Sequence, residues 1–503
     1  MMKSKIVEKN LKWALCYQVV TLLLGFITPR FIILVYGSEV NGLQSAIMQI
    51  LNILTLLQAG SVSATVYLLY RPFAIQNYDD VSFHLYSAIR FFRKISLLFF
   101  IIMTTGACIF AFTMKGSICK IELFFAFFIL GAKSALDMLL TTKYVTIFSA
   151  DQNKYIISIA NLIEKIVYYF LMYLTIVGRI HFIVLYIDLV LGCIAKLFFY
   201  RVVFDNKYKL LINTKKKYNY TPIKGRNFSM INEIAHSVAV SSIAILFSYL
   251  YGLSASSVFS VYNLALTMLM MIGIVLYESF APSFGHLITE RNVEKINQVF
   301  STFTCGFNII NLVMYMCVAF LIIPFVKIYT TGMNDAEYIN KLLGLLTVLF
   351  GLIYTFRIPF NILVSTSGLF KETSMQPFVF SLISVFISII LGKIRMEFIL
   401  IGPIVFYIAN FLYQKNKLKK LLPEMRLNGK WDQYVISILG VLMSALVSYT
   451  FIDFAIGIVK LVMFGIIWFV ISTTYALSLY SFNNRAEILH LFNYAKARIY
   501  KAK

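Results

Sequence analysis

The chain has 503 residues, of which 60% are hydrophobic and only 13% are charged. In a soluble globular domain about a quarter of the residues are charged, so this composition excludes a soluble enzyme or a soluble binding domain. The formal net charge of +23 is high enough for a nucleic-acid-binding protein, but the positions of the charges, described below, indicate membrane topology instead.

Apolar stretches long enough to cross a bilayer follow one another along almost the whole chain. A transmembrane helix needs about 20 mostly apolar residues, and we predict about 14 such helices. The predicted fold class is therefore an all-α, multi-pass membrane protein. An even number of spans places both chain ends on the same side. The approximate ranges are 11–36, 42–68, 95–114, 121–149, 155–178, 181–203, 228–250, 256–281, 299–323, 338–366, 375–392, 397–413, 431–452 and 456–481.

Lysine and arginine residues gather in alternate loops. Of the 45 in the chain, roughly 31 fall in alternate loops and the two tails, about 7 in the opposite loops and about 7 inside spans, and such an excess marks the cytoplasmic side. The densest clusters are 207–226, 415–430 and 485–503. We therefore expect both termini on the cytoplasmic side of the membrane, and no nucleic-acid partner. Residues 71–94 mix apolar and charged side chains and are predicted to form a separate interfacial helix on the inner face.

An internal repeat divides the first twelve spans into two sets of six. The pair Tyr36-Gly37 recurs at Tyr251-Gly252, and Lys154 corresponds to Lys371, so the two matches agree in their sequence offset to within two residues. Duplicated halves are common in transporters. We predict two pseudo-symmetric six-helix lobes at 1–203 and 228–413, a cytoplasmic basic linker at 204–227, and two extra helices with a cytoplasmic tail at 414–503.

Ionisable residues lie inside several predicted spans. A charge there costs roughly 2.5 to 3.5 kcal/mol, so such residues normally face a polar interior and mark a transport pathway. Arg357 also precedes Pro359, where a helix break is expected. We assign five candidate substrate-binding cations and three candidate ion-coupling acids. The cations are Arg30, Lys133, Lys143, Lys165 and Arg357, and the acids are Asp137, Glu164 and Asp188.

Mutual neutralisation is the competing interpretation of these charges. Lys133 and Asp137 are four residues apart and share a helix face. Lys133 with Glu164, or Lys165 with Asp188, would also bridge two helices, and the sequence does not choose among these pairs. Lys196 lies in the inner half of the sixth span, where its long side chain could instead reach the interface. An acid neutralised by a lysine would be a poor ion-coupling site.

Patterns typical of enzymes are missing from the sequence. The five histidines and six cysteines show no metal-ligand spacing, and neither a GxxxxGKS/T phosphate loop nor a GxSxG turn occurs. We therefore expect no catalytic residue, no metal and no cofactor.

Several stretches of the chain resemble bacterial polysaccharide flippases of the O-antigen and capsule type. These flippases form the oligosaccharide-lipid branch of the multidrug/oligosaccharidyl-lipid/polysaccharide exporter superfamily. The similarity is carried by Phe26 to Gly37, Glu39, Asn41 to Leu43, Gln49 to Leu54, Ser149 to Tyr155, Ser257 to Asn263, and Phe284 to His286.

The resemblance implies two six-helix lobes that rock between inward-open and outward-open states, with two extra helices at the C-terminus. The implied substrate is an undecaprenyl-diphosphate-linked oligosaccharide repeat unit, moved from the inner to the outer leaflet for cell-surface polysaccharide synthesis. An ion gradient is the implied energy source. The implied partners are this lipid-linked oligosaccharide, membrane lipid, and a polysaccharide polymerase with other assembly proteins, and we expect a monomer.

Two alternatives remain open at this point. A multidrug extruder of the same superfamily would have an acid-rich cavity for cationic drugs, whereas the cations outnumber the acids among the in-span residues. A membrane-embedded polysaccharide polymerase would need a large outer loop, and an acyltransferase a buried histidine.

Overall fold

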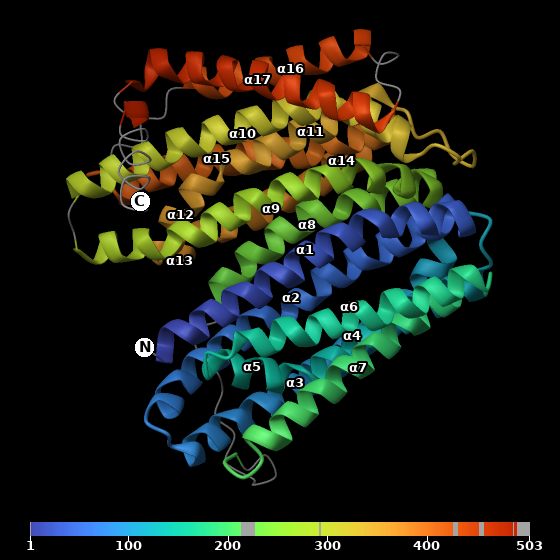
Figure 1. Cartoon of the computed structure of the whole chain (residues 1–503), viewed down its shortest axis with the longest axis vertical. Coiled ribbons are helices and arrows are strands. Elements are labelled where there is room, and N and C mark those ends of the chain that lie inside the picture. Colours follow the sequence, from blue (N-terminus) through green and yellow to red (C-terminus); the bar gives the residue numbers. More distant parts are fainter. Residues whose placement is uncertain are drawn as a thin grey trace. The chain divides into compact units, whose positions relative to one another are not determined.

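The computed structural model describes residues 2–212, 227–290, 293–425, 431–451, 457–485 and 487–489. Long helices dominate these ranges, and no strand occurs in them (Figure 1). Thirteen of the described helices are long and apolar enough to cross a membrane. The predicted all-α, multi-pass membrane fold is confirmed. Most of the predicted basic linker and of the basic tail lies outside the described residues.

The helices follow the predicted spans in order. The first seven are α1 (Met2–Tyr36), α2 (Ser38–Ala74), α3 (Tyr78–Thr113), α4 (Lys120–Leu140), α5 (Thr142–Ala150), α6 (Lys154–Val177) and α7 (Ile183–Lys207). The next group is α8 (Asn227–Tyr251), α9 (Leu253–Glu290), α10 (Val293–Tyr329), α11 (Lys341–Phe356), α12 (Ile358–Thr366), α13 (Phe370–Thr373), α14 (Met375–Gly392), the 3-10 helix η1 (Met396–Leu400) and α15 (Ile401–Leu421). The last two are α16 (Trp431–Phe451) and α17 (Ile458–Asn483). Helix α2, with 37 residues, contains the second predicted span, 42–68, and extends beyond it at both ends.

The chain forms two compact units. The first comprises Met1–Ser237 with Tyr251–Ser257, and the second comprises Val238–Leu250 with Val258–Lys503. Each unit is described by itself below.

The internal repeat is visible in the helix boundaries. Helices α1 and α8 end at Tyr36 and Tyr251, and one glycine separates each from the next helix. Gly37 and Gly252 have φ angles of 86° and 93°, a region that only glycine adopts without steric cost. The sharp turn between the first two helices of each half is therefore encoded by the recurring Tyr-Gly pair.

Both halves also contain a helix break at corresponding positions. Thr141 separates α4 from α5, Arg357 separates α11 from α12, and the short helices that follow are nine residues each. In the second half, Pro359 lacks an N–H group and cannot continue the helical hydrogen bonds. In the first half, the Thr141 hydroxyl donates to the backbone carbonyl of Asp137 at 2.7 Å, a side-chain bond that tends to bend a helix. One break is thus built into the covalent chain, and the other depends on side-chain contacts.

Residues 71–94 do not form the separate interfacial helix that the sequence suggested. Helix α2 continues to Ala74, and after a short turn α3 runs unbroken from Tyr78 to Thr113. Asn77 caps α3 by accepting a hydrogen bond from the Asp80 N–H at 3.2 Å. The prediction was wrong because arginine and lysine before the apolar run are good helix formers and give no signal to end a helix.

The residues after the first turn connect α2 to two other segments of the first unit. The Glu39 carboxylate accepts hydrogen bonds from the Ser117 N–H at 2.9 Å and from its hydroxyl at 2.7 Å. Asn41 donates to the Ser257 hydroxyl at 2.8 Å. Gly42 lies so close to the start of α9 that a Cβ atom would stand 1.8 Å from the Leu253 carbonyl oxygen. Contacts within the first unit thus give Glu39, Asn41 and Gly42, the residues that follow α1, a structural role.

The turn between α5 and α6 is held by the end of α7. The Asp151 carboxylate accepts hydrogen bonds from the Tyr208 phenol and from the Lys207 ammonium, the latter at 2.9 Å. Burial, together with the adjacent carboxylate, raises the pKa of the Tyr208 phenol. Asn153 donates to Asp151 at 2.5 Å. These contacts fix the polar turn between two membrane-spanning segments.

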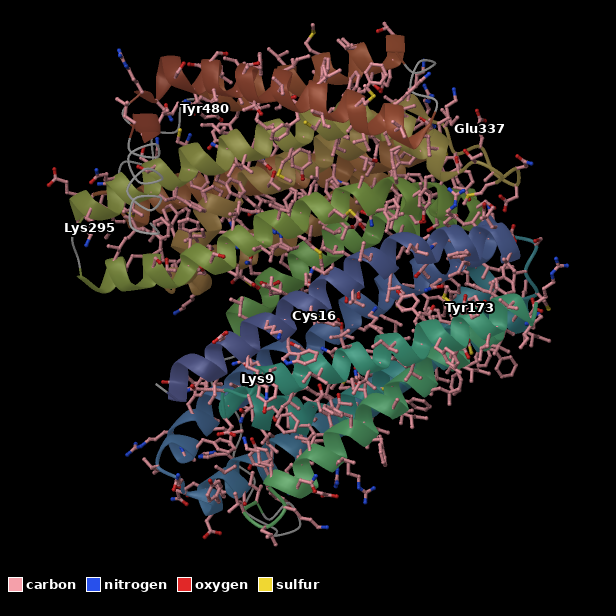
Figure 2. The ribbon with its side chains drawn as sticks, in the orientation of Figure 1. Lys9, Cys16, Tyr173, Lys295, Glu337 and Tyr480 are labelled. Carbon is pink, nitrogen blue, oxygen red and sulfur yellow. The ribbon has the colours of Figure 1, made fainter. Side chains whose placement is uncertain are left out.

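The first helix holds the same turn from its other side. Asn10 donates to the Gln152 carbonyl at 2.8 Å and accepts from the Tyr155 N–H at 2.7 Å. Lys9 places its ammonium 4.0 Å from the centre of the Tyr155 ring, and Figure 2 shows Lys9 beside the start of α6. The turn motif therefore has a structural role in joining α1, α5, α6 and α7.

Candidate functional site

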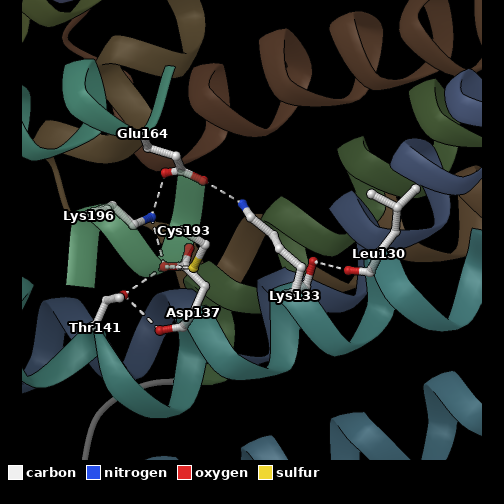
Figure 3. Close-up of polar contacts among 8 residues, drawn as sticks. Leu130, Lys133, Asp137, Thr141, Glu164, Cys193 and Lys196 are labelled. Atoms are coloured by element: carbon white, nitrogen blue, oxygen red, sulfur yellow. Dashed lines mark hydrogen bonds and ion pairs between the residues drawn. The ribbon is translucent and has the colours of Figure 1, made fainter. Parts of the chain in front are cut away.

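Four in-span ionisable residues form one connected network in the first unit (Figure 3). The Lys133 Nζ lies 2.7 Å from Glu164 Oε1. The Lys196 Nζ lies 2.7 Å from Glu164 Oε2 and 2.7 Å from Asp137 Oδ1. Two lysines and two carboxylates give a formal charge of zero. We call Lys133, Asp137, Glu164 and Lys196 the charged cluster.

Helix packing brings the cluster together near the middle of the membrane. Helix α7 packs against both α4 and α6. Glu164 is the eleventh of the 24 residues of α6, and Lys196 is the fourteenth of the 25 residues of α7. At 1.5 Å per residue, both lie roughly 15 Å or more from either end of their helix. At that depth a charge is costly unless it is paired.

Lys196 does not extend toward the interface as the alternative interpretation allowed. Its side chain is 6% exposed, and its ammonium lies between two carboxylates. Glu164 is also largely buried, with 14% of its side chain exposed. The interior charges compensate one another, so the cluster as a whole does not attract an anion by net charge.

The cluster also touches the helix break in α4–α5. The Thr141 hydroxyl lies 2.9 Å from Asp137 Oδ1, the same oxygen that contacts Lys196. The Cys193 sulfur lies 3.7 Å from that oxygen. A change in the charge or position of Asp137 would therefore alter the contacts of Thr141, the residue at the break.

The structure decides between the two interhelical bridges left open by the sequence. The first of these bridges, between Lys133 and Glu164, is present. The other bridge is absent: Lys165 forms no ion pair with any described residue. Asp188 instead accepts a hydrogen bond from the Thr175 hydroxyl at 2.8 Å. Asp188 is 4% exposed, so it is a buried acid with a neutral hydroxyl as its hydrogen-bond donor.

Lys143 and Arg30 lie outside the charged cluster. Lys143 is in α5, with its ammonium 4.6 Å from the centre of the Tyr144 ring, and it interacts electrostatically with Arg93 and Arg201. Arg30 is a half-buried residue of α1, which continues as a helix through Pro29. The predicted substrate-binding residues thus do not form one group within the first unit.

Arg357 belongs to the second unit and lies at the α11–α12 break. It is 7% exposed. Its guanidinium carbon lies 4.6 Å from the centre of the Tyr354 ring and 5.4 Å from that of Tyr407. Arginine stacks well on aromatic rings, and a desolvated contact of this kind contributes about 2 kcal/mol. Aromatic stacking thus stabilises a buried cation at the break.

Sequence reasoning missed two members of this site. Lys196 was set aside because its position near the inner half of a span suits a long side chain that reaches the interface. Thr141 carries no charge and was not considered. A count of charges gives no signal for Lys196, because the interiors of spans four and five already contain three lysines, Lys133, Lys143 and Lys165, against the two acids Asp137 and Glu164.

Comparison by sequence finds no matching protein family and no matching curated protein. Comparison by structure finds transporters of the MOP superfamily. An inward-facing multidrug resistance MATE family transporter matches with a TM-score of 0.64 at 14% identity, over 80% of this chain and 95% of its own. A MATE structure in the bent conformation gives 0.55 at 14% identity, over 83% and 96%. The lipid II flippase MurJ, inward closed, gives 0.59 at 15% identity, over 93% and 99%. The chain has the fold of these transporters.

Proposed function

We propose that this protein is a flippase for lipid-linked oligosaccharides. It moves undecaprenyl-diphosphate-linked repeat units from the inner to the outer leaflet of the bacterial cytoplasmic membrane, where they are used for cell-surface polysaccharide. The fold supports a transporter, and the extent of the structural match is the observation that favours a flippase over a multidrug extruder.

The MATE structures are matched almost over their full length, yet the inward-facing and bent ones cover only 80% and 83% of this chain. The lipid II flippase covers 93% of it. A closer match in overall size therefore favours a substrate of the flippase class.

The charge balance supports an anionic substrate. The charged cluster is neutral, so any net charge comes from the remaining predicted residues of each unit. In the first unit these are the cations Arg30, Lys143 and Lys165 against the acid Asp188, and in the second unit the cation Arg357. Lysine and arginine bind phosphate through charge-assisted hydrogen bonds, and the same cations would repel a cationic drug.

Asp188 is the acid that we propose for ion coupling. Asp137 and Glu164 are held by lysines, whereas Asp188 has a hydroxyl partner at 2.8 Å. A buried carboxylate without a bound cation is suited to take up a proton or a metal cation from a gradient.

Replacing Asp188 by Asn tests this assignment. The Asn oxygen still accepts the hydrogen bond of Thr175, so the variant is expected to fold, while its neutral side chain can no longer change charge. A coupling free energy of about 1 to 3 kcal/mol corresponds to a loss of about 5- to 150-fold in gradient-driven transport. The measurement is uptake into proteoliposomes with and without an imposed ion gradient. Glu122→Gln, a change at an acid that pairs with His181 near the start of α4, is the control. Retained gradient dependence in Asp188→Asn would refute the assignment.

The proposed function is tested by reconstituting the full chain in vesicles that contain a fluorescent undecaprenyl-diphosphate-linked glycan. Protein-dependent movement of the glycan between leaflets is the expected result, and Lys143→Ala and Arg357→Ala are expected to slow it. Movement of a cationic dye without movement of the lipid would instead identify a multidrug extruder. Elongation or acylation of the glycan would identify an enzyme.

A further inference from the structure

Three cations from three helices of the first unit lie close together, away from the charged cluster. Helix α3, which carries Arg93, packs against α5, which carries Lys143. The ring centres of Tyr144 and Tyr200, the neighbours in sequence of Lys143 and Arg201, lie 5.7 Å apart. Arg93 and Arg201 both act electrostatically on Lys143, and Asp205 opposes them. The Arg201–Asp205 contact is long, at 3.9 Å between Nε and Oδ2, and the Arg201 side chain is 74% exposed. Arg93 is also exposed. Three positive charges and one negative charge leave a formal charge of about +2 on this surface.

These cations lie at the depth of lipid headgroups. Arg93 is 20 residues from the end of α3 at Thr113, and Arg201 is 18 residues from the start of α7 at Ile183. At 1.5 Å per residue, these separations are about 30 Å and 27 Å. The hydrocarbon core is about 30 Å thick, so both arginines reach the membrane–water boundary at one end of the unit. By the charge distribution of the loops, this is the cytoplasmic boundary.

An apolar cleft between α4 and α7 leads away from these cations into the membrane. It is lined mainly by Leu136, Leu140, Val190, Ile194 and Leu197, with Lys133, Thr141 and Cys193 at its polar side. Leu140 precedes Lys143 by three residues and Leu197 precedes Arg201 by four, so the cleft and the cations share the same stretches of chain. Leu136 and Ile194 are 40% and 53% exposed, so the cleft opens on the outer face of the helices.

We propose that this surface binds a polyprenyl diphosphate of the inner leaflet, with the diphosphate on Lys143, Arg93 and Arg201 and the single prenyl chain in the α4–α7 cleft. The proposal rests on the proposed function, because it makes the surface a docking site for the lipid carrier of the exported glycan. It also connects that lipid to the charged cluster, since Lys133 lines the cleft and pairs with Glu164.

The charge and the shape of the surface favour this occupant over an ordinary phospholipid. A diphosphate that bridges a lipid and a sugar carries about two negative charges, which match the surface charge, whereas a phosphodiester headgroup carries about one. The cleft between the two helices has a volume of about 30 Å³, so it takes only one narrow apolar segment, such as the part of a prenyl chain next to the diphosphate. A phospholipid would bring two acyl chains.

The test measures binding of radiolabelled undecaprenyl diphosphate to the full-length protein in nanodiscs. The double variant Lys143→Gln/Arg201→Gln is expected to bind about tenfold or more weakly, because each removed charge-assisted contact lowers affinity by about that factor. Lys120→Gln is the matched control: Lys120 lies at the opposite end of α4, with its ammonium 5.5 Å from the Phe112 ring, and the variant is expected to bind as the unaltered protein does.

A second pair of variants tests the cleft separately. Leu136→Trp fills the groove and is expected to weaken binding of the prenyl lipid, while competition by inorganic pyrophosphate at the cations stays unchanged. Ile187→Trp is the control, because Ile187 is a similarly exposed residue of α7, at 42%, that does not line the cleft.

The outcomes separate this site from the proposed function. Unchanged binding in the double variant, or equal competition by phosphatidylglycerol, would overturn the docking site even if the protein flips the glycan. Weakened binding in the double variant and in Leu136→Trp would support the docking site even if the flipping assay failed.

Discussion

Replacing Lys196 by Met is expected to destabilise the first unit and to abolish transport. The Lys196 ammonium contacts Asp137 and Glu164, each at 2.7 Å, and its side chain is 6% exposed. Met fills a similar volume without the charge, so Asp137 would lose its ion pair with Lys196, and Glu164 would keep the one with Lys133. Removing one partner of a buried ion pair costs about 3 to 5 kcal/mol. The loss is measured by thermal unfolding in detergent and by flux in proteoliposomes.

Lys165→Met provides the matched control for stability. Lys165 follows Glu164 directly in α6, lies at the same depth, and forms no ion pair with any described residue. Its replacement removes a lysine without breaking a bridge, so the unfolding temperature should change little. Adding Asp137→Asn to Lys196→Met restores the charge balance and should recover part of the stability. Equal unfolding temperatures for Lys196→Met and Lys165→Met would show that the cluster is not structurally important.

Gly42→Ala is expected to prevent correct folding of the first unit. The added methyl group would lie 1.8 Å from the Leu253 carbonyl oxygen and 2.6 Å from the carbonyl carbon. Both atoms are backbone, so no side-chain rotation relieves the clash. The start of α9 would have to move, which would break the hydrogen bond between Asn41 and Ser257. Overpacking of this kind commonly costs about 1 to 3 kcal/mol, and a backbone clash this close exceeds that range.

The yield of monodisperse protein after membrane extraction measures this effect, and it should fall steeply. Gly25→Ala is the control, because a Cβ atom at Gly25 meets nothing within 4 Å. In the helix α1, alanine at that position should be neutral or stabilise the protein by up to about 1 kcal/mol. A Gly42→Ala protein with normal yield and unfolding temperature would contradict the close approach of α2 and α9.

The order of the membrane helices could be predicted from the sequence, because a span is a local property of about 20 residues. Their lengths could not, since helices such as α3, with 36 residues, continue well beyond the apolar stretch. The pairing of charges could not be predicted either. Asp137 and Lys196 are 59 residues apart, and only the packing of α4 against α7 brings them together. Lys133 with Glu164 was one of several bridges of equal plausibility. The prediction of a separate interfacial helix at residues 71–94 was wrong, because α3 already begins at Tyr78 and runs without a break into the apolar stretch that starts near residue 95.

The two helix breaks show the same limit. Proline at position 359 pointed to the break at Arg357, but a proline alone does not decide a break, because α1 continues through Pro29 and α10 through Pro324. The corresponding break at Thr141 had no such signal, and the sequence predicts one continuous span over residues 121–149. Its bend accompanies hydrogen bonds from a threonine hydroxyl to Asp137, and a threonine inside a helix is common enough to pass unnoticed.

These two breaks differ in the chemistry that accompanies them. No ligand, proton or membrane potential can give Pro359 an N–H group, so the gap in the backbone hydrogen bonds of the second half is permanent. The Thr141 hydroxyl instead contacts Asp137, a member of the charged cluster. Neutralising Asp137 would therefore change the contacts at the first break, whereas no change of charge can alter the missing donor at the second.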